Sequence, residues 1–126
     1  MKSVRPTIAQ LDRMWSKAVK LRAGNKSEYS QKESGLNSHH IEGKGTHRLR
    51  WELDNGICLT GGEHKYIAHR QDRAADFRKW AMKKRGITED DVTIWKRQLG
   101  GIDRFAMYLY LKEEIKKYEK RSQENE

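Results

Sequence analysis

Five histidines in the middle of the chain are the residues best suited to chemistry. They occupy positions 39, 40, 47, 64 and 69 of 126 residues. A neutral imidazole binds divalent transition metals, and with an unperturbed pKa near 6.5 it also accepts a proton at neutral pH. These side chains are therefore candidates for metal binding and for proton transfer.

The spacing of these residues limits what each can do. His39 and His40 are adjacent, residues 41–54 separate His40 from Asn55, and residues 56–63 separate Asn55 from His64. Neighbouring residues of a regular strand point to opposite faces, so His39 and His40 cannot share one role. One can bind a metal ion while the other faces a substrate, and a helix packed on the strands can bring His64 to the same ion.

The single cysteine, Cys58, excludes other kinds of site. One cysteine forms no disulfide within the chain and supplies no Cys-x-x-Cys zinc knuckle. Any metal must therefore be held by other residues. Cys58 lies in the apolar run ICL, where we expect it to be buried and inert.

Two strands and a short helix must position the histidines. We expect strands over residues 37–41 and 57–60, separated by a basic loop and an Asp54-Asn55-Gly56 turn. Gly61 and Gly62 then lead into a short helix. The remaining pattern is helical, which gives an α+β fold with further helices over residues 8–21, 75–85, 88–99 and 102–121.

Length and charge narrow the class of protein. A chain of 126 residues is enough for one domain, with a core that contains the histidines at about 36–70 and helical flanks at 7–22 and 73–121. The net charge of +9 favours a polyanionic partner, nucleic acid before acidic membrane. Residues 1–35 carry the largest excess of positive charge, with eight basic and three acidic residues.

No apolar run approaches the roughly 20 residues of a membrane span, and the N-terminal segment lacks the apolar stretch of a secretory signal. We therefore expect a soluble, cytoplasmic protein that does not contact a membrane. The last helix carries apolar residues on a rotating stripe, from Phe105 and Leu109 towards Leu111 and Ile115. Both a packed monomer and a dimer are compatible with that stripe.

The segment SHHIEGKGTHRLRWELDNGICL, followed by EHKYIAH, resembles the HNH (His-Asn-His) endonucleases, a family with a ββα-metal fold that includes the nuclease colicins and many small phage nucleases. The flanking segments TIAQLDRMWSKAVKLR and FRKWAMKKRGITEDD are also similar to phage nucleases of the lambdoid NinG recombination type. The resemblance implies a phage-encoded, metal-dependent enzyme that cuts or nicks DNA during recombination, packaging or processing. In a phage protein the site of action would be the cytoplasm of the host.

The resemblance also implies a role for each matching residue. His39 corresponds to a metal ligand, His40 to the general base, Asn55 to the residue that braces the loop around His40, and His64 to a second ligand. His69 is the expected third ligand, although its spacing differs from the usual His-x-x-x-His. On a regular helix residues five apart lie about 140° apart, so His69 reaches the ion only if His64 precedes the first turn or the helix bulges.

The metal and the phosphate contacts follow from the same residues. Three imidazoles favour Zn, Ni, Co or Mn over Mg, whereas two imidazoles with waters leave Mg or Mn plausible. Lys44, Arg48 and Arg50 are the expected phosphate-binding residues in the basic loop. His47 matches no role in the pattern, and we expect it near phosphate in the loop.

The sequence departs from many members of the family by lacking a structural zinc. The two expected Cys-x-x-Cys pairs are replaced by Gln31 and Ser34, and by Thr60 and Glu63. We expect four tryptophans to clamp the flanking helices onto the strands instead. These tryptophans are Trp15, Trp51, Trp80 and Trp95.

Two other functions remain open. A non-catalytic DNA-binding or regulatory module would keep the ββα-metal frame without needing His40. An RNA substrate is less well supported, because no aromatic stacking platform is interleaved with the basic loop. The form of DNA that is bound, and whether one strand or both are cut, also stay open.

Overall fold

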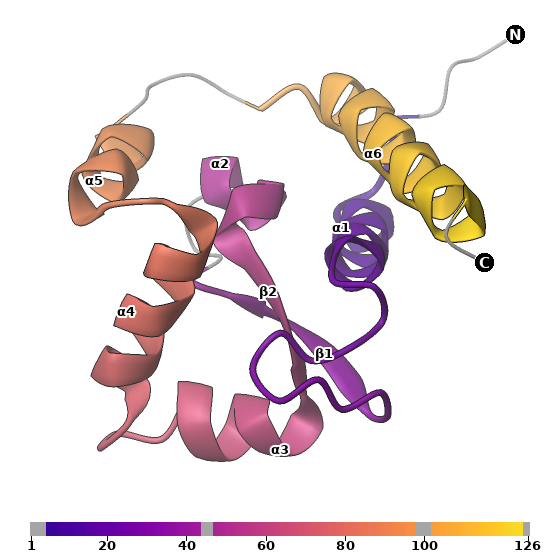
Figure 1. The fold of residues 1–126 in the computed structure, drawn as a ribbon. Helices are drawn as coiled ribbons and strands as arrows, with labels where there is room; N and C mark the ends of the chain where they lie inside the picture. Colours follow the sequence, from indigo (N-terminus) through magenta and orange to yellow (C-terminus); the bar gives the residue numbers. More distant parts are fainter. Residues whose placement is uncertain (1–4, 44–46, 98–101, 125–126) are drawn as a thin grey trace, which may run out of the picture.

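The computed structural model describes residues 5–43, 47–97 and 102–124, without the side chains of residues 47 and 48. It confirms the α+β class: a two-stranded antiparallel sheet lies at the centre, with helices on both sides (Figure 1). The elements are α1 (Ile8–Arg22), β1 (Leu36–His40), α2 (His47–Arg50), the 3₁₀ turn η1 (Leu53–Asn55), β2 (Gly56–Thr60), α3 (Gly61–Glu63), the π-helical turn η2 (His64–Ala68), α4 (Ala74–Arg85), α5 (Glu89–Arg97) and α6 (Arg104–Glu124). Among the described residues, no helix has both the length and the apolar character needed to cross a membrane.

The two strands pair in the expected order but begin one residue earlier than predicted. Leu36 lies opposite Thr60, and His40 lies opposite Gly56. Ile41, the expected last residue of the first strand, still donates its backbone N–H to the Asn55 carbonyl at 2.8 Å. The ladder ends at His40 because Asn55 belongs to the 3₁₀ turn rather than to a strand.

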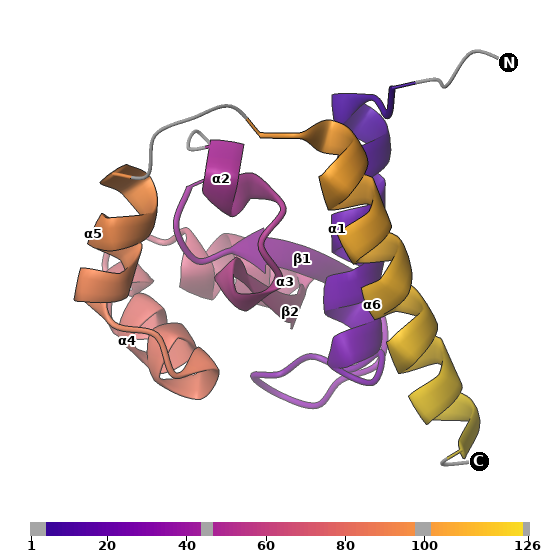
Figure 2. The same ribbon diagram turned by 90° about the horizontal axis from the view of Figure 1, so that it is seen from above.

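The two faces of the sheet contact different helices. α1 and α6 lie side by side on one side of the hairpin, and α4 and α5 lie on the other (Figures 1 and 2). Side chains of β2 alternate between the two layers, as a strand buried on both faces must. Ile57 and Leu59 join the core on the α4 side, whereas Cys58 joins the core on the α1 side.

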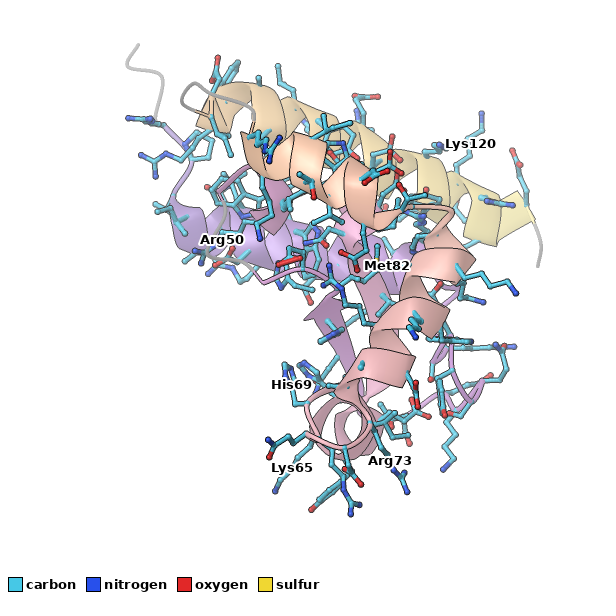
Figure 3. The ribbon with its side chains drawn as sticks, turned by 90° about the vertical axis from the view of Figure 1, so that its left-hand side faces the viewer. Arg50, Lys65, His69, Arg73, Met82 and Lys120 are labelled. Carbon is cyan, nitrogen blue, oxygen red and sulfur yellow. The ribbon has the colours of Figure 1, made fainter. Side chains whose placement is uncertain are left out.

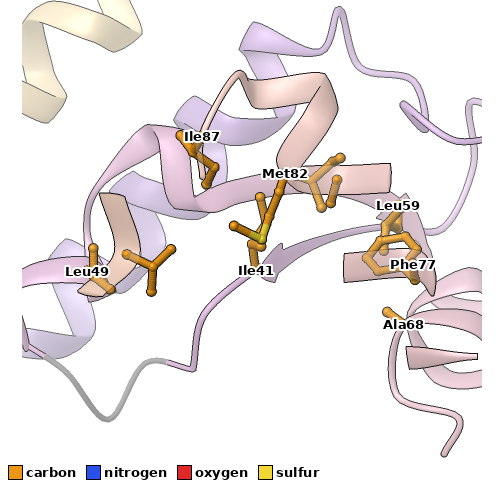
Figure 4. Close-up of a cluster of buried hydrophobic side chains, with 10 residues drawn as sticks. Ile41, Leu49, Leu59, Ala68, Phe77, Met82 and Ile87 are labelled. Carbon is orange, nitrogen blue, oxygen red and sulfur yellow. The ribbon is translucent and has the colours of Figure 1, made fainter. Parts of the chain in front are cut away.

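The core on the α4 side links the hairpin to the helices that follow it. Met82 of α4 packs with Ile41 at the end of β1, and Phe77 lies beside Leu59 and Ala68 (Figure 4). These side chains are at most 7% exposed. The contact fixes η2, which carries Ala68, against α4.

The core on the α1 side contains two of the four tryptophans. Trp15 and Trp51 are buried there, whereas Trp80 and Trp95 are half-buried against the other core. Cys58 is fully buried in the same core, and burial raises the pKa of its thiol to about 11. A thiol with this pKa stays protonated at neutral pH, in agreement with the expectation that Cys58 is inert.

Buried polar contacts hold the loop between α1 and β1. The Glu28 carboxylate forms an ion pair with Arg85 of α4 and accepts a hydrogen bond from the Cys58 backbone N–H. Ser27 is fully buried and donates its hydroxyl to Glu63. Of the four residues that replace the cysteine pairs, Thr60 and Glu63 take part in such contacts, whereas Gln31 and Ser34 are exposed.

The helices after the hairpin lie where the sequence predicted them, but some of their ends differ. α4 stops at Gly86, whose φ of 71° is in the left-handed region that glycine tolerates. α6 begins at Arg104 rather than at residue 102, because the Asp103 carboxylate accepts hydrogen bonds from the first backbone N–H groups. Phe105 and Leu109, at the start of the apolar stripe, are 51% and 47% exposed, so packing uses the Leu111 side of the helix.

Gly56 is the point where β2 crosses closest to α1. A Cβ atom at this position would lie 2.5 Å from Val19 Cγ2 and 2.8 Å from Trp15 Cζ2. We predict that Gly56→Ala lowers the free energy of unfolding by about 1–3 kcal/mol, as overpacking does in other cores. Urea denaturation measures this change. Gly43→Ala is the control, because nothing lies within 4 Å of its Cβ position; equal effects of the two substitutions would contradict the prediction.

Candidate metal centre and the adjacent histidine

The end of β1 sends its two histidines to opposite sides of the sheet. His39 points to the α4 side, where it is 8% exposed and its ring centroid lies 5.4 Å from that of Phe77. His40 points to the α1 side, where its ring stacks on Trp15 at 3.9 Å with an interplanar angle of 8°. The alternation expected of a strand therefore separates the two imidazoles.

A π-helical turn brings His64 and His69 together. The His69 backbone N–H bonds to the His64 carbonyl at 3.2 Å, which closes one i→i+5 turn. This bulge is the second of the two arrangements that would let residues five apart reach one ion. The π-helical turn comes directly after α3 in the chain, and α3 is a single turn of helix.

A capping box fixes the start of this helical segment. The Thr60 hydroxyl accepts a hydrogen bond from the Glu63 N–H, and the Glu63 carboxylate accepts one from the Thr60 N–H. Burial alone would raise the pKa of the Glu63 carboxyl, but hydrogen bonds from Ser27, Ser30 and Thr60 lower it. A charged Glu63 thus anchors the helix start, one residue before His64.

His39, His64 and His69 form a cluster whose potential ligand atoms all lie within 4.8 Å of one another. The Nε2 atoms of His64 and His69 are 2.9 Å apart. Two nitrogens bound to tetrahedral zinc at 2.0–2.1 Å are separated by roughly 3.3 Å. The three side chains are therefore close enough to hold one metal ion, and small rotations suffice to reach that geometry.

The cluster lies at an accessible edge of the protein. His39 is buried, His64 is half-buried and His69 is exposed. In Figure 3, His69 lies on the side of its helical segment that faces the strands, whereas Lys65 points outward. An ion held here would be bound from one side by protein and would remain reachable from the other.

The surroundings of His39 and His64 favour the neutral imidazole. Burial, together with the nearby His64, His69 and His40, lowers the pKa of His39 to about 3. Burial and the positive charges of His69 and His40 also lower the pKa of His64. Neutral imidazole is the form that binds a metal, so the lowered pKa values of His39 and His64 favour metal binding at pH 7.

His40 is held by a backbone carbonyl as well as by Trp15. Its Nε2 lies 2.8 Å from the carbonyl oxygen of Arg50. A carbonyl oxygen only accepts, so Nε2 carries the proton in this contact and Nδ1 carries the lone pair of the neutral ring. One ring nitrogen of His40 is thus assigned to positioning and the other is the basic atom.

Asn55 closes the loop that supplies this carbonyl. Its side chain is fully buried, and its Oδ1 accepts a hydrogen bond from the Glu42 N–H at 2.8 Å. Its Nδ2 donates to the carbonyls of Glu42 and Leu49 at 2.9 and 3.1 Å. Both ends of the loop after β1 are therefore tied to one side chain, as expected of a residue that braces the His40 loop.

Asp12 of α1 is a positioning residue that the sequence did not reveal. Its carboxylate accepts two hydrogen bonds from the Arg50 guanidinium, at 2.8 and 2.7 Å, and one from the Trp51 indole at 2.9 Å. These bonds hold the residue whose carbonyl contacts His40. The available signal was that Asp12 is the one acidic residue of a helix with four basic residues.

Of the three expected phosphate-binding side chains, the structure describes only that of Arg50. Lys44 and the side chain of Arg48 lie outside the described part of the chain. The Arg50 side chain is only 20% exposed because of its contact with Asp12. A role for Arg50 in binding phosphate stays a prediction, and the contact with Asp12 gives this residue a structural role.

We predict that the protein binds one Zn²⁺ or Co²⁺ per chain through His39, His64 and His69. Calorimetric titration of metal-free protein measures the stoichiometry and the affinity. His69→Ala should lower the affinity at least about tenfold, because it removes one of three imidazoles. Lys65→Ala, on the same helical turn, should leave it unchanged; an unaffected His69→Ala protein would exclude the cluster as the binding site.

The low pKa of His39 predicts that metal-free protein loses stability in acid. The folded-state pKa of about 3 lies below the unfolded value of 6.5. Stabilisation by neutral His39 is therefore complete above pH 6.5 and is lost as the pH falls towards 3. Between pH 8 and pH 5 the free energy of unfolding in EDTA should fall by about 2 kcal/mol.

Urea denaturation at the two pH values measures that loss. His39→Leu removes the titrating group, so most of the pH dependence in this window should disappear with it. Carboxylates contribute little above pH 5, because their unfolded pKa values lie near 4. An unchanged dependence in His39→Leu protein would assign the effect to other groups.

Comparisons with protein-family models, with curated proteins and with solved structures found no match to this chain. The functional evidence therefore consists of the residues of the site and their geometry. Foremost are the three-histidine cluster on one side of β1 and the fixed ring of His40 on the other.

Proposed function

We propose that this protein is a metal-dependent endonuclease of the HNH type, which hydrolyses phosphodiester bonds of DNA. In this proposal β1, β2 and the α3–η2 segment are the ββα-metal core. The observation that carries it is that the two histidines at the end of β1 lie in different surroundings. His39 joins a cluster suited to a metal, and His40 is fixed by a backbone carbonyl with a second nitrogen that can take a proton.

The residues of the cluster fit the requirement for a cation. Phosphodiester hydrolysis needs an activated water, relief of the charge that develops on the phosphate, and help for the departing oxygen. A divalent cation, when bound by His39, His64 and His69, supplies Lewis acidity and charge neutralisation. The three imidazoles favour Zn, Ni, Co or Mn over Mg.

His40 is the proposed general base. A water molecule positioned at Nδ1 loses its proton to this atom, because Nε2 is already occupied by the Arg50 carbonyl. The stacked Trp15 ring and the carbonyl restrict the rotation of the imidazole. A fixed ring places the basic atom without loss of side-chain entropy during the reaction.

Asn55 and Asp12 support the residues around the proposed base. Asn55 fixes the backbone of residues 42 and 49, and Asp12 fixes the side chains of residues 50 and 51. Arg50, whose carbonyl contacts His40, lies in the chain between residue 49, held by Asn55, and residue 51, held by Asp12. Both Asn55 and Asp12 are proposed as positioning residues rather than catalytic ones.

Cleavage of supercoiled plasmid DNA tests the proposal. Purified protein is incubated in EDTA and then with Mg²⁺, Mn²⁺, Ni²⁺, Co²⁺ or Zn²⁺ separately. We predict nicked or linear product only with metal, and a loss of at least about 100-fold in rate for His40→Ala, as is typical when a general base is removed. DNA binding by His40→Ala should remain.

Thr93→Ala is the control, since Thr93 is an exposed residue of α5 to which no role is assigned. It should cleave at a rate close to that of the unmodified protein. Circular dichroism shows whether each variant folds. If no metal supports cleavage although DNA is bound, the nuclease proposal fails and a non-catalytic DNA-binding module takes its place.

A further inference from the structure

The exposed side of α1 carries a groove of about 400 Å³ lined by Arg13, Lys17 and Lys20. These residues are four and three positions apart, so they lie on neighbouring turns of one helix face. The other lining residues are polar or apolar, and none of those described is acidic. The groove therefore presents positive charge that is not cancelled along its walls.

A second groove continues from the first at the C-terminal end of α1. It has a volume of about 590 Å³ and is lined by Arg22, Lys26 and Arg121, again without an acidic residue among those described. Leu21 lines both grooves, so the two are contiguous. We refer to them together as the α1 grooves; their walls come from α1, the loop that follows it and the C-terminal part of α6.

Three of the six basic residues on these walls are directly available to a ligand. Within the described parts of the chain, Arg13, Lys20 and Arg121 form no ion pair with a carboxylate. The other three basic residues pair with acidic groups at the surface. These pairs are Lys17 with Glu119, Arg22 with Asp54 and Lys26 with Glu33. Exposed ion pairs contribute little, so a phosphate can displace them.

The grooves adjoin the strand that carries His40. Ser16 lines the first groove and shares hydrogen bonds with Ser38 of β1, two residues before His40. Trp15, the neighbour of Ser16, stacks on His40 itself. A strand of nucleic acid lying in the groove would therefore run alongside β1 towards the proposed base.

The dimensions also suit a phosphate backbone. Arg13 and Lys20 are separated by about 10 Å along the helix axis. Phosphates follow one another at about 3.4 Å along the axis of each strand of B-DNA, so this stretch spans about three of them. Amide and hydroxyl groups of Asn25 and Ser16 add hydrogen-bonding partners of the kind that contact phosphate and sugar.

We propose that the α1 grooves bind the sugar–phosphate backbone of the DNA strand that is presented to His40. This inference rests on the proposed nuclease function, for which it names the substrate-binding surface. The occupant is a polyanion because every charged residue on the walls is basic. Contacts of this kind set register and affinity without reading sequence.

Fluorescence anisotropy with a labelled 30-base-pair DNA duplex tests the inference. The test variant is Arg13→Gln with Lys20→Gln, since neither residue has an ion-pair partner to lose. The control is Lys79→Gln with Lys83→Gln, two exposed positions of α4 on the opposite side of the hairpin. Binding is measured in EDTA on the His40→Ala background over a series of salt concentrations, so cleavage does not enter.

The groove variant should bind more weakly by at least about tenfold at 0.1 M salt. The slope of log K against log salt should become shallower by about two, one for each lost phosphate contact. The control variant, with the same net charge, should keep most of the affinity and the slope. Equal weakening of both variants, or none in the groove variant, would overturn the inference.

The outcomes for the groove and for the nuclease are separable. Cleavage by the unmodified protein together with unaltered DNA binding by the groove variant would overturn the groove and leave the nuclease. DNA binding that depends on the groove, without cleavage, would overturn the nuclease and leave the groove. Equally tight, groove-dependent binding of a 30-base-pair RNA duplex would overturn the assignment of DNA as the occupant.

Discussion

The buried amide of Asn55 is the contact on which the candidate site depends. Its three hydrogen bonds tie the backbone of residues 42 and 49 to the residue just before β2. The long connection between the strands therefore has a fixed shape near His40. Arg78 of α4 holds the same corner from outside through the Ile41 carbonyl and Glu42. Because a buried amide without partners costs free energy, these bonds form together or not at all.

The sequence revealed those parts of the fold that depend on periodic burial or local capping. Alternation separated His39 from His40, and the expected helix ends at Ile8 and Arg85 agree with the structure. The class of the fold followed from the same patterns, whereas the place of His69 in the cluster was implied by the resemblance. The nuclease activity and the roles of His40 and Asn55 were implied by resemblance alone, and they stay proposals.

Contacts between residues distant in sequence had no such signal. Nothing in the spacing of Asp12 indicates that it meets Arg50 and Trp51, nor that Glu28 meets Arg85. Spacing along a single helix does not decide the ion pairs either: Glu113 contacts Lys116 and Glu114 contacts Lys117, although Lys117 lies four residues after Glu113. Small differences in side-chain geometry decide such pairs, and a helical template does not contain them.

The polar contacts of Ser27, Glu28 and Glu63 have a consequence for the supply of metal. They fasten the loop before β1 to the hairpin and to α4 through protein atoms. A small domain held together by structural zinc unfolds when a chelator removes the ion. In this chain, loss of an ion from the three histidines would leave the contacts of that loop in place. A cation at the cluster would then be exchangeable without loss of the loop's attachment.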